Sequence, residues 1–113
     1  MENIKLVRLF NNEIKEELKS IKIDSQNDSY LINELVAMRF MSFVAIKIGE
    51  QPTESEFRNK SKNPLNHFQM EMQCLSGKIL WATFVYVENN HIVNPYKTNI
   101  ELLDNNYNTI KKL

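Results

Sequence analysis

The chain has 113 residues, of which 42% are hydrophobic and 10% aromatic, as is typical of one folded domain covering residues 1–113. Its 14 basic and 14 acidic side chains cancel to a formal net charge of zero, so no long-range field favours binding to nucleic acid or to an anionic membrane. The one cysteine, Cys74, cannot form an internal disulfide, and the N-terminal residues contain no apolar signal segment. We therefore expect a cytoplasmic protein that does not enter a membrane.

Two segments in the first half of the chain predict helices. In the first segment, apolar residues recur at steps of three and four, the spacing of one helix face. These residues are Ile4, Val7, Phe10, Ile14, Leu18 and Ile21. The second segment, residues 29–48, is apolar nearly all round and is followed by Gly49, so we expect a buried helix that ends there. Its charged residues, among them Glu34 and Arg39, argue against a membrane span.

Two further segments have a Thr followed three residues later by a Glu, the spacing of a capping box at a helix start. Thr53 and Glu56 therefore predict a short third helix. Thr98 and Glu101 open the C-terminal segment, residues 98–113, in which apolar residues also recur at helical spacing. That segment is rich in Asn, a poor helix former, so a C-terminal helix is favoured while a strand stays open.

The second half of the chain predicts a β-hairpin. Residues 67–74 alternate strictly between polar and apolar side chains, which indicates a strand with one buried face. Ser76 and Gly77 are the predicted turn, and residues 79–87 are rich in the β-branched and aromatic residues that strands favour. On the apolar side of this hairpin we expect Cys74 to be a small core residue.

A second predicted turn at residues 89–90 leads to a short third strand from His91. Pro95 has no N–H to donate, so it should confine this strand to the sheet edge. The predicted fold is therefore α+β: two N-terminal helices, with a short third as an option, packed on a three-stranded antiparallel meander, and a C-terminal helix or strand.

The turn also predicts which strand residues face the core. With a two-residue turn at 76–77, Met72 pairs with Trp81 on the core face. The opposite face then mixes apolar and polar side chains, and it is the predicted partner-binding surface. Its residues are Leu80, Phe84, Tyr86, Val93, Gln69 and Glu71. Either a helix covers the apolar strip on this face, or the strip is exposed for another protein or a second copy of the chain.

We find no pattern typical of a catalytic, metal or cofactor site. His67 and His91 are the only histidines, and such a pair could act as general acid and base in RNA cleavage, but nothing in the sequence brings them together. Metal binding would need Cys74 as well, which on a strand points to the opposite face from His67. The two glycines, Gly49 and Gly77, stand in unrelated contexts and do not form a phosphate-binding loop.

By elimination, the sequence favours a protein that works by contact and is not an enzyme. The most concrete hypothesis is a small bacterial or phage immunity-type inhibitor, which neutralises a toxin or effector by direct binding. A homodimer is a further option. The alternatives are a nucleic-acid-binding regulator, through the basic residues Arg58, Lys60 and Lys62, or a small RNA-cleaving enzyme that uses His67 and His91.

Overall fold

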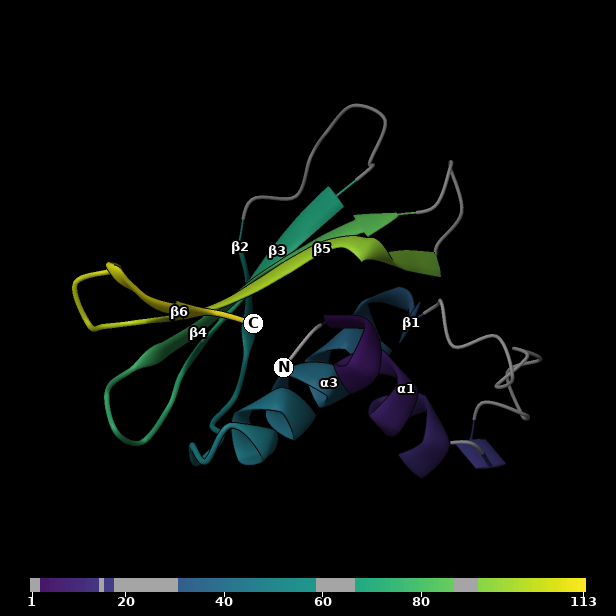
Figure 1. Ribbon diagram of the computed structural model, residues 1–113, viewed down its shortest axis with the longest axis horizontal. Coiled ribbons are helices and arrows are strands. Elements are labelled where there is room, and N and C mark those ends of the chain that lie inside the picture. Colours follow the sequence, from purple (N-terminus) through teal and green to yellow (C-terminus); the bar gives the residue numbers. More distant parts are fainter. Residues whose placement is uncertain (1–2, 15, 18–30, 59–66, 87–91) are drawn as a thin grey trace.

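In the computed structural model, the described residues are 3–14, 16–17, 31–58, 67–86 and 92–113 (Figure 1). Their helices and strands follow in the order α1 (Asn3–Glu13), β1 (Leu31–Ile32), α3 (Asn33–Lys47), β2 (Glu56–Arg58), β3 (His67–Gln73), β4 (Ile79–Tyr86), β5 (Ile92–Leu103) and β6 (Thr109–Lys112). The strands form one antiparallel sheet in the order β1-β5-β4-β3-β2, and β6 pairs with β5. Figure 1 shows α1 and α3 together on one face of this sheet.

The core lies between the two helices and the sheet. Of the face that the helical spacing predicted, Val7 and Phe10 of α1 and Ile14 just after it are buried, whereas Leu18 and Ile21 lie outside the described residues. The Phe40 ring of α3 lies 5.2 Å from that of Phe10 and 6.2 Å from that of Phe84 in β4. The aromatic rings thus connect both helices to the sheet in one continuous core.

α3 ends where the sequence predicted. Gly49 has φ 84°, and its N–H donates to the Ile46 C=O (3.0 Å) while the Glu50 N–H donates to the Ala45 C=O (2.8 Å). This pair of bonds satisfies carbonyls at the helix end, and the left-handed backbone suits glycine. Within the described part of the chain, no helix is both long and apolar enough to cross a membrane.

The predicted short third helix is wrong. Residues 53–55 have no regular structure, and Glu56–Arg58 form strand β2, which pairs with β3. The Thr53 hydroxyl donates to the Gln73 C=O (2.6 Å) and does not cap a helix. A capping box matches only four residues, so pairing with a neighbouring strand overrode this local signal.

The predicted register of the β3–β4 hairpin is wrong by one residue. The Cys74 N–H donates to the Lys78 C=O (2.8 Å) and the Gly77 N–H donates to the Cys74 C=O (2.9 Å), so three residues form the loop between this pair. Met72 consequently pairs with Leu80. Because side chains alternate along a strand, a shift of one residue turns every β4 side chain to the opposite face.

β5 is not the short edge strand that Pro95 predicted. It is 12 residues long, with β4 on one side and both β1 and β6 on the other. The pairs Thr83 with Asn99 and Val85 with Asn94 leave residues 95–98 in a bulge opposite one β4 residue. A bulge accommodates a residue that has no N–H for the ladder. Tyr86 of β4 pairs with Val93 of β5, whereas the predicted turn at residues 89–90 and His91 lie outside the described residues.

The C-terminal segment forms strands, so the favoured C-terminal helix is wrong. Residues 98–103 belong to β5, and the Asn-rich residues 104–108 form the turn into β6. The predicted three-stranded meander is therefore corrected to a six-stranded antiparallel sheet, while the α+β class and its antiparallel pairing are confirmed.

The core position of Phe84 gives a stability prediction. Its ring is 0% exposed and stacks on Phe68 at 4.9 Å, so Phe84→Ala should lower the free energy of unfolding by about 3–5 kcal/mol, measured by urea denaturation. Ile110 is 51% exposed, and Ile110→Ala should stay within about 0.5 kcal/mol of wild type. A Phe84→Ala protein as stable as the Ile110→Ala control would contradict the observed register.

Candidate functional site

The sheet face that points away from α1 and α3 holds the candidate site, and we call it the outer face. Among the described residues, no helix covers it (Figure 1). One row of paired residues crosses it from β2 to β6. The row consists of Glu56, Glu71, Trp81, Glu101 and Lys112. Unlike the inner face, the outer face is therefore rich in charged side chains, and Trp81 lies among them.

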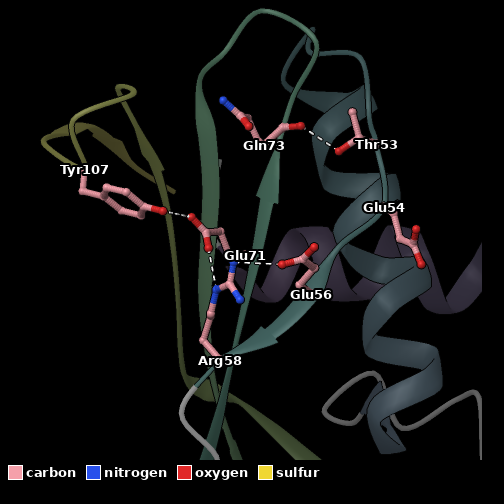
Figure 2. A pocket seen from close by; sticks show the side chains of 7 residues that line it. All are labelled: Thr53, Glu54, Glu56, Arg58, Glu71, Gln73 and Tyr107. Atoms are coloured by element: carbon pink, nitrogen blue, oxygen red, sulfur yellow. Dashed lines mark hydrogen bonds and ion pairs between the residues drawn. The ribbon is translucent and has the colours of Figure 1, made fainter.

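Glu71 lies at the centre of a cluster of polar groups and is only 7% exposed. Arg58 Nε donates to Glu71 Oε2 (2.6 Å), and Arg58 Nη2 also lies 2.8 Å from Glu56 Oε2. The Tyr107 hydroxyl donates to the other oxygen, Glu71 Oε1 (Figure 2). Burial of a carboxylate is unfavourable unless it is paired, so these two donors explain how Glu71 is tolerated there. We call the group of four residues the Glu71 cluster; it consists of Glu56, Arg58, Glu71 and Tyr107.

The charge of Glu71 changes the proton affinity of both neighbours. The pKa of Tyr107 is raised above its usual value, first because its hydroxyl donates to Glu71 and then because of burial. The pKa of Arg58 is raised as well, first by its hydrogen bond to Glu71 and then by the negative charge of that carboxylate. The cluster therefore holds a neutral tyrosine and a charged guanidinium around one carboxylate.

Tyr107 belongs to the turn between β5 and β6, yet it reaches across β4 to β3. Its ring meets the ring of Trp81 edge to face, with centroids 6.4 Å apart. Together the two rings form an aromatic ridge on the outer face. The Tyr107 residue is 55% exposed, so part of this ridge is open to solvent.

Two hollows open on the outer face. The first, of about 370 Å³, lies among the Glu71 cluster, Gln73, and the residues Thr53 and Glu54 that precede β2 (Figure 2). The second, of about 250 Å³, is lined in part by Thr83, Asn99, Glu101 and Lys112. Three carboxylates and one guanidinium line the first hollow, so its formal charge suits a cationic group. The described residues include no group of three or more His, Cys, Asp or Glu arranged to hold a metal ion.

The predicted partner-binding residues divide between the two faces. Leu80, Phe84 and Val93 are 0% exposed on the inner face, and the Tyr86 ring packs beside Phe68 on that same face, 5.3 Å away. Three residues of the expected apolar strip are therefore part of the core, and the fourth, Tyr86, is half-buried against it. Gln69 and Glu71 do lie on the outer face, Gln69 with its side-chain amide donating to the Thr83 hydroxyl (3.2 Å).

The other residues considered from the sequence occupy separate places. His67 is half-buried at the start of β3, and His91 lies outside the described residues, so the RNA-cleavage alternative stays a prediction. Arg58 is a strand residue paired with carboxylates, whereas Lys60 and Lys62 also lie outside the described residues. Cys74 is confirmed as a core residue with 2% exposure, and its burial raises the pKa of its thiol.

Sequence reasoning missed Trp81 and Tyr107 as outer-face residues. Trp81 was assigned to the core by the shifted register. Tyr107 lies in residues 98–113, for which a helix was favoured, although residues 104–106 are Asp-Asn-Asn, which favour a turn. That turn signal could have placed Tyr107 at a hairpin end, but not beside Glu71.

Comparisons of the chain with protein-family models, with curated proteins and with solved structures find no match.

The raised pKa of Tyr107 predicts how stability depends on pH. The folded state favours the neutral phenol, so this contribution is fully present below the ordinary tyrosine pKa of about 10 and is lost as the pH rises through the higher folded pKa. The stability of the wild type should therefore fall more steeply above pH 10 than that of Tyr107→Phe. Urea unfolding of both proteins across this range checks the difference, and parallel curves would contradict the hydrogen bond to Glu71.

The Glu71 cluster also predicts an asymmetry between its two charges. Arg58→Leu leaves a buried carboxylate without its cation, whereas Glu71→Leu leaves Arg58 paired with Glu56 and 44% exposed. A buried carboxylate without a cation lowers stability more than an exposed guanidinium that is still paired. Arg58→Leu should therefore unfold at a lower urea concentration than Glu71→Leu. The reverse order would show that Glu71 is not buried as described.

Proposed function

We propose that the protein is a small protein-binding inhibitor of the immunity type, which neutralises a toxin or effector by direct contact through its outer face. One observation carries this proposal: Arg58, Trp81 and Tyr107 gather on that face. Arg, Trp and Tyr are the residue types that most often dominate the binding energy of protein interfaces. Here they stand beside two hollows that a partner's side chains would fill.

The charge around the first hollow indicates the chemistry of the partner. Glu54, Glu56 and Glu71 outnumber Arg58 there, although the whole chain has no net charge. A basic contact surface on the partner would complement this local pattern and speed association. A toxin or effector that acts on nucleic acid fits this requirement, because it must attract phosphate groups with its own Lys and Arg residues.

The arrangement of the Glu71 cluster supports contact more than catalysis. A catalytic acid or base needs a free position from which it reaches a substrate. The two oxygens of Glu71 instead accept from Arg58 and from Tyr107, as in a network that holds its own members in place. We therefore infer a binding role for this face and no reaction.

A matched pair of exposed Asn residues tests the proposed surface. Asn99 lies on the outer face beside the second hollow, and Asn12 is on α1, in the layer on the other face of the sheet. Asn99→Arg should abolish capture of the partner from source cells, because it adds bulk and positive charge to the contact face, while Asn12→Arg should capture as much as wild type. Quantitative mass spectrometry of the bound proteins measures both.

Both variants change exposed side chains and should keep the urea midpoint of the wild type. For the inhibitor role, co-expression of the captured protein with wild type should protect host cells, and co-expression with Asn99→Arg should not. Equal capture by both variants would remove the outer face from the proposal. Absence of any stoichiometric partner, together with degradation of RNA by the purified chain, would replace it with an enzymatic function.

A further inference from the structure

Two hairpin loops lie within the described residues, β3–β4 and β5–β6, and they have the same backbone construction. We number five positions in each loop, Cys74 to Lys78 in β3–β4 and Asp104 to Asn108 in β5–β6. The N–H at position 1 donates to the C=O at position 5 in both loops, from Cys74 to Lys78 (2.8 Å) and from Asp104 to Asn108 (2.8 Å). The N–H at position 4 donates to the C=O at position 1 in both loops, from Gly77 to Cys74 (2.9 Å) and from Tyr107 to Asp104 (3.0 Å). Gly77 and Tyr107 therefore occupy equivalent positions.

This fourth position requires a left-handed backbone. Gly77 has φ 92° and Tyr107 has φ 67°. Glycine adopts this conformation freely, whereas a bulky side chain meets a steric penalty. In the described part of the chain, Tyr107 is the one non-glycine residue with positive φ. A tyrosine at the position where the β3–β4 loop has Gly77 therefore needs an interaction that compensates for the backbone strain.

Two sets of interactions compensate for this strain. The Asp104 carboxylate accepts the N–H groups of Asn106 (2.8 Å) and Asn108 (2.9 Å), which braces the turn. The Tyr107 hydroxyl adds its hydrogen bond to Glu71 (Figure 2). The Tyr107 ring adds its edge contact with Trp81. The strained backbone directs the Tyr107 side chain across β4, so the strain and the contact with Glu71 depend on each other.

We propose that Tyr107 is a latch over the outer face: when closed it occupies one oxygen of Glu71 and shields Trp81, and when the turn at residues 104–108 relaxes it uncovers both. Backbone strain favours opening, and the hydroxyl bond favours closing. The latch concerns the same face as the proposed function but acts in the isolated protein, so either proposal can fail alone.

The surroundings of the turn allow such a movement. Arg58 holds the second oxygen of Glu71 independently of Tyr107, so opening leaves the buried carboxylate with a charged donor. The side chains of β6 are exposed, so little apolar packing holds the turn from that side. The Leu113 N–H donates to the Ile100 C=O (2.9 Å), which anchors the end of the chain and confines movement to the turn.

Two substitutions separate the hydroxyl from the strain. Tyr107→Phe keeps the bulky side chain and loses the hydroxyl, and Tyr107→Gly loses both the hydroxyl and the steric penalty. By amide hydrogen exchange, the residue-107 N–H should exchange roughly tenfold faster in Tyr107→Phe than in wild type, as expected for a lost bond to a charged group. It should exchange more slowly in Tyr107→Gly than in Tyr107→Phe, because glycine relieves the turn. The Gly77 N–H serves as an internal reference that none of these changes affects.

Trp81 is the only tryptophan in the chain, so its fluorescence reports the shielding directly. Quenching by acrylamide should increase from wild type to Tyr107→Phe and again to Tyr107→Gly. The control Tyr86→Phe, which removes a phenolic hydroxyl from the inner face, should quench like wild type. Equal exchange at residue 107 in wild type and Tyr107→Phe, or equal quenching of Trp81 in wild type and Tyr107→Gly, would overturn the latch.

Discussion

The register of the β3–β4 hairpin decides which side chains of β4 face the helices. It depends on a three-residue loop that ends in the left-handed backbone of Gly77. With this loop, Leu80 and Phe84 join Met72 in the core, and Trp81 lies on the outer face. A loop of two residues would exchange the two faces of β4. Both the core and the candidate site therefore follow from one turn.

The outer face carries polar groups that the sheet could not bury separately. Glu71 is nearly as inaccessible as a core residue, and it is compatible with folding because Arg58 and Tyr107 each supply a donor. These donors come from β2 and from the β5–β6 turn, so the cluster ties the edge strand to the last hairpin across β3 and β4. The same contacts shape the first hollow, which connects the stability of the sheet with the surface offered to a partner.

Local signals in the sequence were reliable where they came from side-chain periodicity along one element or from the glycine that ends it. The face of α1 that begins with Val7, the end of α3 at Gly49 and the alternating strand β3 were all predicted correctly. The capping-box signals at Thr53 and Thr98 failed, because both segments instead complete the sheet through backbone bonds to neighbouring strands. Of the candidate site, Gln69 and Glu71 were placed on the correct face, and Trp81 and Tyr107 were not.

The sequence by itself determined the α+β class, the two helices in the first half of the chain, and which residues of β3 face the core, because periodicity within one segment records which of its faces is buried. Only the tertiary structure decided the pairing of β4, the strand conformation of the C-terminal segment and the meeting of Tyr107 with Glu71, 36 residues away in the chain. Such contacts depend on loop geometry and on hydrogen bonds between distant segments. Neither leaves a periodic trace in the residues that make them.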